Sequence, residues 1–285
     1  MKSVIAVSAL VGAALLGPGR DLSLHRSHAP DIHPGPVAGA MAHPTLHEAQ
    51  SRCRYEAERT LTVSAPSDGR LRLDAGSGSL EVVGVAGLNE VRAVARACAS
   101  HEEFLDDLRL SSERNGNEVF IETHYPDMDG FGWGNRYARL DLKVEVPEAM
   151  AAEIRDSSGE MKAGHLGDLR IEDSSGGLEV YSVQGNVSID DGSGEIHLWD
   201  ITGDVEIDDG SGEIDVDGVG GMVVLDDGSG EIDVRDVEGT VRVVQDGSGS
   251  IDVDGVGGDF IVERDGSGGI NFHDVKGKVD IPRKR

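Results

Sequence analysis

The chain has 285 residues, with 53 acidic and 26 basic side chains, and its formal net charge at pH 7 is −27. Nucleic acid is excluded as a partner because an acidic surface repels phosphate, whereas divalent cations and basic molecules would be attracted. Residues 151–285 hold 32 of the acidic and 11 of the basic residues, so this second half carries most of the charge. Glycine is frequent, at 40 residues, and aromatic residues make up 4%, which favours an all-β protein with tight turns.

The first 19 residues have the features of an export signal. Lys2 precedes an apolar run over residues 4–16, which Gly17-Pro18-Gly19 ends. The run is too short to cross a bilayer, so we expect no transmembrane segment in the mature chain. The protein is therefore predicted to be exported, to the periplasm, the outer surface or the medium. Residues 20–50 are rich in Pro, Ala and His without periodicity, and they predict a disordered linker.

Residues 51–150 predict an N-terminal β module that caps a longer repeat. Strands are expected over residues 91–99, 118–123 and 139–146, with a short helix or turn over 102–108. Residues 71–83 contain a first copy of the phrase that recurs in the second half, Gly-Ser-Gly-Ser-Leu-Glu-Val at 76–82, so the module is expected to include the first coils as well as the cap. An open end of a repeat offers unpaired strand edges, so a cap is needed there.

Two cysteines, Cys53 and Cys98, are the only ones in the chain. In an exported protein they are expected to form a disulfide that ties the incoming segment to the cap, and two free thiols are the alternative.

A glycine-rich loop over residues 125–137 carries aromatic side chains, among them Phe131 and Trp133. Exposed aromatic rings of this kind can contact a glycan or a protein. Alternatively, the loop folds back onto its own module.

From residue 156 onward the phrase Asp-x-Ser-Gly-x-apolar recurs seven times, with 17 to 19 residues between successive glycines. Such a short fixed period predicts a solenoid in which each repeat is one coil. Residues 194–212 show the coil: Ile196 and Leu198 alternate with polar residues, as do Val205 and Ile207, and glycines punctuate both turns. We predict a parallel β-solenoid over residues 151–285, with two short strands in each coil of about 18 residues.

One column of the repeat is acidic in every coil: Asp156, Asp173, Asp191, Asp209, Asp227, Asp246 and Asp265. Stacked coils place these carboxylates about 5 Å apart, where they repel one another unless they are neutralised. In one explanation each Asp accepts hydrogen bonds from its own turn. In the other, the carboxylates bind calcium, which would then gate folding. The best calcium ligands are in the central coils: Asp190, Asp191, Asp208, Asp209, Asp226 and Asp227.

Tyr181 and Trp199 occupy the same outward column in neighbouring coils. They predict an exposed aromatic pair that contacts a glycan or a protein, with simple packing as the alternative. The chain ends in a basic tail, Lys276, Lys278, Arg283, Lys284 and Arg285, which is expected to screen the acidic last coil and discourage end-to-end stacking.

The repeat phrases resemble those of a bacterial family of exported β-strand-repeat proteins known as putative adhesins. The matching stretches are Ser-Gly-Glu-Ile at residues 193–196 and 229–232, and Val-Glu-Gly-Thr-Val at 237–241. The resemblance covers residues 60–281, and it implies a role in surface adhesion without catalytic residues.

The predicted function is that of a non-catalytic, exported, monomeric solenoid with a structural or adhesive role at the cell envelope. No cofactor is expected unless the aspartate column binds calcium. A polysaccharide-active β-helix enzyme is the less favoured alternative, because such enzymes build a cleft from long loops, and the turns here are short.

Overall fold

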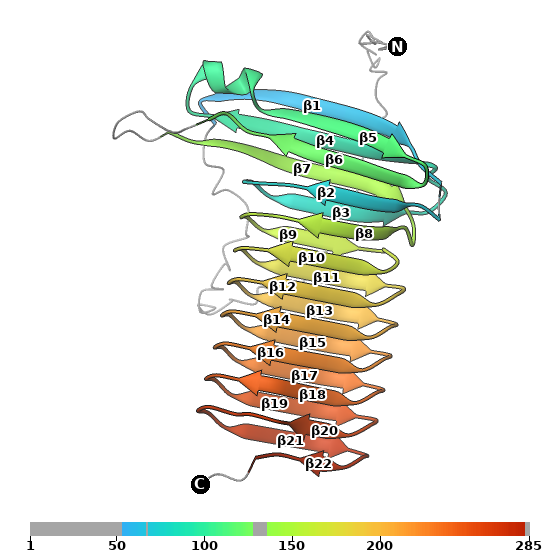
Figure 1. The fold of residues 1–285 in the computed structure, drawn as a ribbon, viewed down its shortest axis with the longest axis vertical. Coiled ribbons are helices and arrows are strands. Elements are labelled where there is room, and N and C mark those ends of the chain that lie inside the picture. The colour runs from blue at the N-terminus through green and yellow to red at the C-terminus, as the bar shows by residue number, and fades with distance from the viewer. Residues whose placement is uncertain (1–52, 67, 128–135, 283–285) are drawn as a thin grey trace, which may run out of the picture. The chain divides into compact units, whose positions relative to one another are not determined.

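A computed structural model describes residues 53–66, 68–127 and 136–282. The predicted export signal, the predicted linker, Phe131, Trp133 and the last three basic residues of the tail lie outside the described residues. The described part is built almost wholly from strands that stack into a parallel β-solenoid, as predicted (Figure 1). Within it, no helix has both the length and the apolar character needed to cross a membrane.

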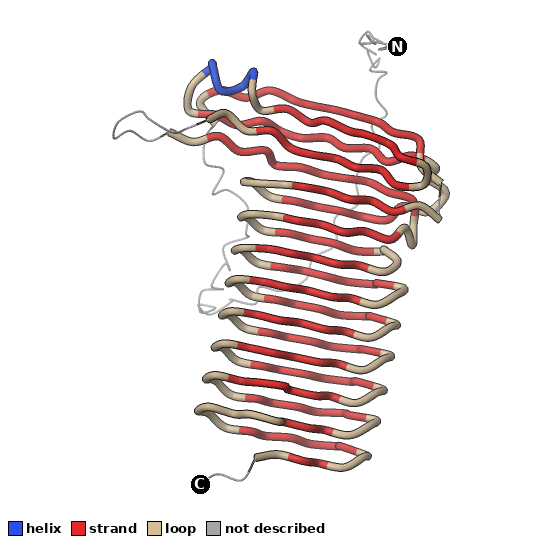
Figure 2. Tube along the Cα trace, in the orientation of Figure 1, coloured by secondary structure: helices blue, strands red, loops and turns tan. Residues whose placement is uncertain are grey.

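Two sheets of 11 strands face each other, and in the solenoid the chain alternates between them (Figure 2). Sheet A has the order β1-β4-β7-β3-β9-β11-β13-β15-β17-β19-β21 and sheet B the order β22-β20-β18-β16-β14-β12-β10-β8-β2-β6-β5. The sheet A strands of the solenoid are β9 (Met161–Gly164), β11 (Leu178–Val183), β13 (Ile196–Ile201), β15 (Ile214–Val219), β17 (Ile232–Val237), β19 (Ile251–Val256) and β21 (Ile270–Val275). Those of sheet B are β8 (Ala151–Arg155), β10 (Leu169–Asp173), β12 (Val187–Asp191), β14 (Val205–Asp209), β16 (Val223–Asp227), β18 (Val241–Asp246), β20 (Phe260–Val262) and β22 (Val279–Asp280).

Parallel pairing keeps each repeat position in register with the same position of the next coil. Ile196 pairs with Ile214, and Ile214 pairs with Ile232, so branched apolar side chains form continuous buried columns between the sheets. The register shifts between Leu225 and Asp226, where β18 has one residue more than β16. The longer coil is therefore accommodated as a bulge, and the columns continue past it.

The Ser-Gly turns bring the backbones of neighbouring coils into direct contact. A Cβ atom added to Gly212 would lie 1.5 Å from the carbonyl oxygen of Gly194, and one added to Gly230 would lie 1.4 Å from that of Gly212. Only glycine fits this column, which explains why the Ser-Gly pair recurs in every coil.

The N-terminal cap differs from the solenoid in its strand directions. It contains β1 (Tyr55–Ser64), β2 (Arg70–Asp74), β3 (Leu80–Val85), β4 (Glu90–Ala99), the short 3₁₀ helix η1 (Glu102–Asp106), β5 (Arg109–Asn115), β6 (Glu118–His124) and β7 (Ala138–Pro147). β2 and β3 pair in parallel with β8 and β9, so they form a coil of the solenoid. β4 runs antiparallel to β7 and to β1, and β5 runs antiparallel to β6, which ends the parallel stack.

A disulfide joins Cys53 to Cys98 and ties the start of the edge strand β1 to β4. At the other end of the molecule the last coil has no strand stacked over it among the described residues, and Phe272 and Val279 are more than a third exposed.

Candidate functional site

The outward face of sheet A carries an aromatic ladder formed by His165, Tyr181 and Trp199. Tyr181 and Trp199 are register partners in neighbouring strands, and their rings stack with centroids 5.3 Å apart and planes 14° from parallel. The edge of His165 packs against Tyr181 at a centroid distance of 5.4 Å. Gly164 pairs with Tyr181, and a Cβ atom there would lie 2.3 Å from the Tyr181 ring. The missing side chain at Gly164 therefore makes room for the ladder.

A groove of about 440 Å³ lies beside Trp199 and is lined by Glu179, His197, Leu198, Trp199, Asp215 and Asp217. Tyr181 stacks on the face of the Trp199 ring that is directed toward the cap, and Trp199 remains 40% exposed. The next residue in the column is Asp217, the register partner of Trp199. The groove thus combines an apolar ring with carboxylate oxygens, which can hold a ligand that has an apolar face and hydrogen-bond donors.

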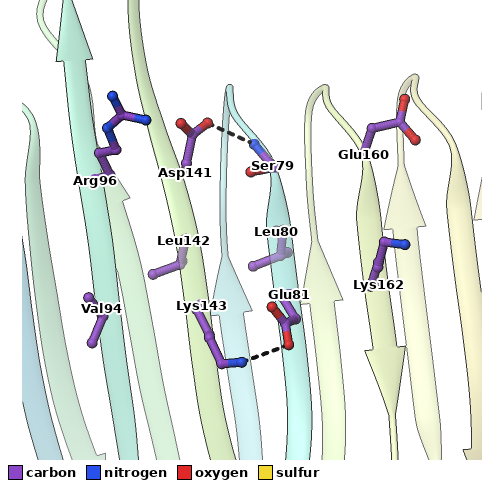
Figure 3. Close-up of a pocket in the computed structure, with 10 residues that line it drawn as sticks. All are labelled: Ser79, Leu80, Glu81, Val94, Arg96, Asp141, Leu142, Lys143, Glu160 and Lys162. Atoms are coloured by element: carbon purple, nitrogen blue, oxygen red, sulfur yellow. Dashed lines mark hydrogen bonds and ion pairs between the residues drawn. The ribbon is translucent and has the colours of Figure 1, made fainter. Parts of the chain in front are cut away.

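A second depression, of about 350 Å³, lies where the antiparallel cap strands meet the first parallel strands (Figure 3). Its charged residues pair with their neighbours: Lys143 donates to Glu81 at 2.8 Å and Lys162 donates to Glu179 at 2.6 Å. Asp141 accepts from the backbone N–H of Ser79 at 3.3 Å (Figure 3). The lining of the depression contains no aromatic ring, so it is a weaker candidate than the Trp199 groove for a ligand that stacks on a ring.

The aspartates of the recurring phrase point into the solenoid. We call this set the inner column: Asp156, Asp173, Asp191, Asp209, Asp227, Asp246 and Asp265. The first six are buried, and Asp227 has no exposed surface. The preceding residues Asp190, Asp208 and Asp226, which we call the outer column, face away from the core. Each adjacent pair that was predicted to bind calcium together is therefore split between opposite faces of its strand, because successive side chains alternate.

The hydrogen bonding of the inner carboxylates is incomplete. Oδ1 of Asp209 accepts from the N–H of Ser211 at 3.1 Å, and Oδ1 of Asp227 accepts from that of Ser229 at 3.0 Å, as expected for Asx turns. Their Oδ2 atoms are buried without a protein partner, and both oxygens of Asp191 are in the same state. The turns thus provide a hydrogen-bond donor for one oxygen of Asp209 and one of Asp227, and they provide none for the second oxygen of either carboxylate.

Burial makes ionisation of the inner column costly. It raises the pKa of Asp156 to about 7, with a smaller contribution from the charge of Asp173. It also raises the pKa of Asp191 and of Asp227 to about 6, and the neighbouring aspartates add to both shifts. At neutral pH the column therefore favours a positive species that neutralises it, either a proton or a cation.

The opposite turn of each coil carries a different polar ladder. Oδ1 of Asp168 accepts from the N–H of Asn186 at 2.9 Å, and Oδ1 of Asn186 accepts from that of Asp204 at 2.9 Å. Oδ1 of Asp204 accepts from the N–H of Met222 at 2.8 Å. We call Asp168, Asn186 and Asp204 the outer-turn ladder. It was missed in the sequence, although its signal was the recurrence of Asp or Asn directly after the turn's glycine.

No three His, Cys, Asp or Glu side chains gather into a single compact metal site among the described residues. A cation at the inner column would have to be held by successive coils. The binding roles predicted for Tyr181 and Trp199 remain predictions, and those for Phe131 and Trp133 concern residues outside the description.

Comparison with solved structures finds chains of similar architecture. A putative cell adhesion protein from Clostridium sporogenes is 16% identical over 81% of this chain and 100% of its own, with a TM-score of 0.34. A putative lipid binding protein from Parabacteroides distasonis is 15% identical over 79% of this chain and 96% of its own, with a TM-score of 0.47. A putative adhesin from Bacteroides fragilis is 13% identical over 80% and 98%, with a TM-score of 0.42. No model of a protein family and no curated protein sequence matches the chain.

Proposed function

We propose that this protein is an exported, non-catalytic β-solenoid with an adhesive or structural role at the cell envelope, and that it contacts a surface glycan through the Trp199 groove. The observation that carries the proposal is the stacked Tyr181–Trp199 pair, in which Trp199 is exposed on a sheet face whose other outward side chains are mostly charged or polar.

The chemistry of the groove suits a sugar. One face of a pyranose ring is apolar and packs on an aromatic ring, while its hydroxyl groups donate hydrogen bonds to carboxylates. Trp199 supplies the ring, and its register partner Asp217 supplies an acceptor on the neighbouring strand, whereas Asp215 already accepts from Arg235 at 3.2 Å. The stack on Tyr181 holds Trp199 in place before binding, so little side-chain entropy is lost.

The regular solenoid supports a non-catalytic role. Over residues 151–282 the strands are joined by short turns, and the titratable side chains are arranged in columns along the coils. Enzymes of this architecture need long loops that bring acids and bases together over a cleft. The export signal and the surface location belong to the proposal and rest on the N-terminal sequence.

The test is binding of the purified full chain to a glycan array, with Trp199→Ala compared with Met222→Ala. Met222 is 41% exposed and lies in a turn outside the aromatic ladder, so it is a matched control. We expect Trp199→Ala to weaken binding about tenfold or more, which corresponds to about 1.4 kcal/mol, and Met222→Ala to leave it unchanged.

Equal binding by both variants would contradict a role for the groove. Binding of poly-lysine instead of any glycan, lost in Trp199→Ala, would reassign the groove to a basic protein segment. Biotin labelling of intact cells with a membrane-impermeant reagent tests the location, and a chain that is labelled only after lysis would contradict surface display.

A further inference from the structure

We propose that the inner column binds divalent cations of the size of Ca²⁺, with each ion held between the carboxylates of neighbouring coils inside the solenoid. This inference goes beyond adhesion and does not depend on it, because the inner column and the Trp199 groove lie on opposite sides of the strand layers.

The spacing of the coils fits such an ion. Strands in a sheet are about 4.8 Å apart, so equivalent oxygens of neighbouring coils have a midpoint about 2.4 Å from each. Ca²⁺ binds oxygen at about 2.3–2.6 Å, whereas Mg²⁺ requires about 2.0–2.1 Å. The register Asp191–Asp209–Asp227 is unbroken through β12, β14 and β16, so this spacing repeats along the column.

The orientation of the carboxylates also fits. Oδ1 of Asp209 and of Asp227 is fixed by a serine N–H of the same turn, which leaves Oδ2 buried and unpartnered in the core. Asp173 has the same arrangement, with Oδ1 accepting from the N–H of Ser174 at 2.8 Å and Oδ2 unpartnered. Buried carboxylate oxygens without partners are costly, and a cation would satisfy them.

Charge explains why the ion should be divalent. Each gap between coils is bordered by two carboxylates, so one divalent ion neutralises one pair. Filling alternate gaps would neutralise the column without placing two ions in adjacent gaps. No three acidic side chains form a compact cluster among the described residues, so each ion would be held by the carboxylates of two neighbouring coils.

The outer column supplies a control within the same coils. Asp190, Asp208 and Asp226 share the coil spacing of Asp191, Asp209 and Asp227, and they carry the same charge. They face away from the core, where water competes with any ligand. If substitutions in the inner column abolish Ca²⁺ binding and substitutions in the outer column do not, then binding depends on the burial and orientation of the carboxylates, and not on their charge alone.

The experiment measures bound Ca²⁺ by calorimetry and thermal unfolding of the full chain at pH 7.5, in chelator and in Ca²⁺ at matched ionic strength. The variants are an inner triple, Asp191→Asn, Asp209→Asn and Asp227→Asn, and an outer triple, Asp190→Asn, Asp208→Asn and Asp226→Asn. Asparagine keeps the shape and the acceptor for the serine N–H, so the turns are preserved.

We expect Ca²⁺ at about 100 times its Kd to raise the wild-type midpoint by roughly 5–10 °C, and Mg²⁺ to raise it less. The inner triple should lose most of the bound Ca²⁺ and of the shift, and it should unfold at or above the wild-type midpoint in chelator. The outer triple should keep both. If the inner triple does not fold, Asp209→Asn alone should lower the number of bound ions.

Three results would overturn the proposal. In the first, the outer triple abolishes the response while the inner triple keeps it, which places the ions on the surface. In the second, the wild type binds no Ca²⁺ at all. In the third, Ca²⁺ has no effect, but acidification from pH 8 to pH 5 stabilises the wild type and not the inner triple, which assigns protons to the column.

Discussion

The two turns of each coil use the same residue type in opposite ways. In the outer-turn ladder an exposed Asp or Asn oxygen reaches along the stack and accepts from the N–H of the next coil, as Asp204 does from Met222 at 2.8 Å. In the inner column a buried Asp accepts within its own turn, and its second oxygen has no partner. The first arrangement is complete in itself and holds coils together. The second leaves a buried oxygen without a partner, and the proposed cation site rests on that oxygen.

Both columns repeat with the same period, so periodicity does not distinguish them. The distinction lies in the direction of the side chain relative to the sheets. Asp209 follows Val205 and Ile207 on the inward side of β14, whereas Asp204 precedes the strand and stays in solvent. A repeated polar residue should therefore be judged by burial and hydrogen-bond completeness, and not by recurrence.

The largest effect is expected from Gly212→Ala, which breaks the turn that presents the inner column. The added Cβ would lie 1.5 Å from the carbonyl oxygen of Gly194, so the coils have to separate. We expect a loss of about 4 kcal/mol or more in the free energy of unfolding, measured by chemical denaturation. Gly269→Ala is the control, because a Cβ atom there meets nothing within 4 Å. Similar losses in both variants would show that flexibility, and not contact between coils, sets the requirement for glycine.

A smaller effect is expected from the pH dependence of Asp156, at the cap end of the inner column. Burial raises its pKa from 3.8 to about 7, so the folded state takes up a proton that the unfolded state releases. This stabilisation is complete below about pH 3.8 and is lost as the pH rises through about 7.

In chelator, the free energy of unfolding of Asp156→Asn should therefore rise relative to that of the wild type as the pH increases from 5 to 8. We expect a difference of about 2 kcal/mol, after the partial solvation of Asp156 is allowed for. Thermal unfolding across this range measures the gain. Asp168→Asn in the outer-turn ladder shows the effect of removing an exposed charge alone. A gain that is no larger in Asp156→Asn than in Asp168→Asn would mean that burial does not control the ionisation of Asp156.

The smallest effect is expected from Asp204→Ala in the outer-turn ladder. The change removes the acceptor of the Met222 N–H, and because Asp204 is exposed, water can replace it. We expect a loss of about 1 kcal/mol, and a much smaller change for Asp204→Asn, which keeps the oxygen as Asn186 does in the coil before. Equal losses from both substitutions, measured by chemical denaturation, would show that the charge and not the hydrogen bond stabilises this turn.

The coil could be predicted from the sequence because one repeat period determines both the pairing of its strands and the positions of its turns. The spacing of the Ser-Gly pairs fixes the register, and alternation around Ile207 fixes the inward side chains. The same alternation places Asp208 outward and Asp209 inward, so the separation of the two acidic columns was available in the sequence. Grouping Asp208 and Asp209 as joint ligands overlooked it.

The cap could not be predicted in the same way, because its pairing is not local. β2 and β3 lie between the coil of β6 and β7 and the coil of β8 and β9, an order that no period reveals. The antiparallel strand β4 depends on its contact with β7, about 40 residues later in the chain. The left-handed backbone at Asp200 and Asp236, with φ of 62° and 51°, could not be predicted either, because Asp at these positions resembles any outward polar residue in the sequence.

The Ser-Gly column has a consequence for how such a molecule can change in evolution. Every coil from Gly176 to Gly268 offers the next one nearly the same surface, a glycine carbonyl against a glycine that has no side chain. Duplicating or deleting a whole coil therefore leaves its neighbours intact and changes the length by about 4.8 Å. The length of the solenoid is therefore set by the number of its repeats.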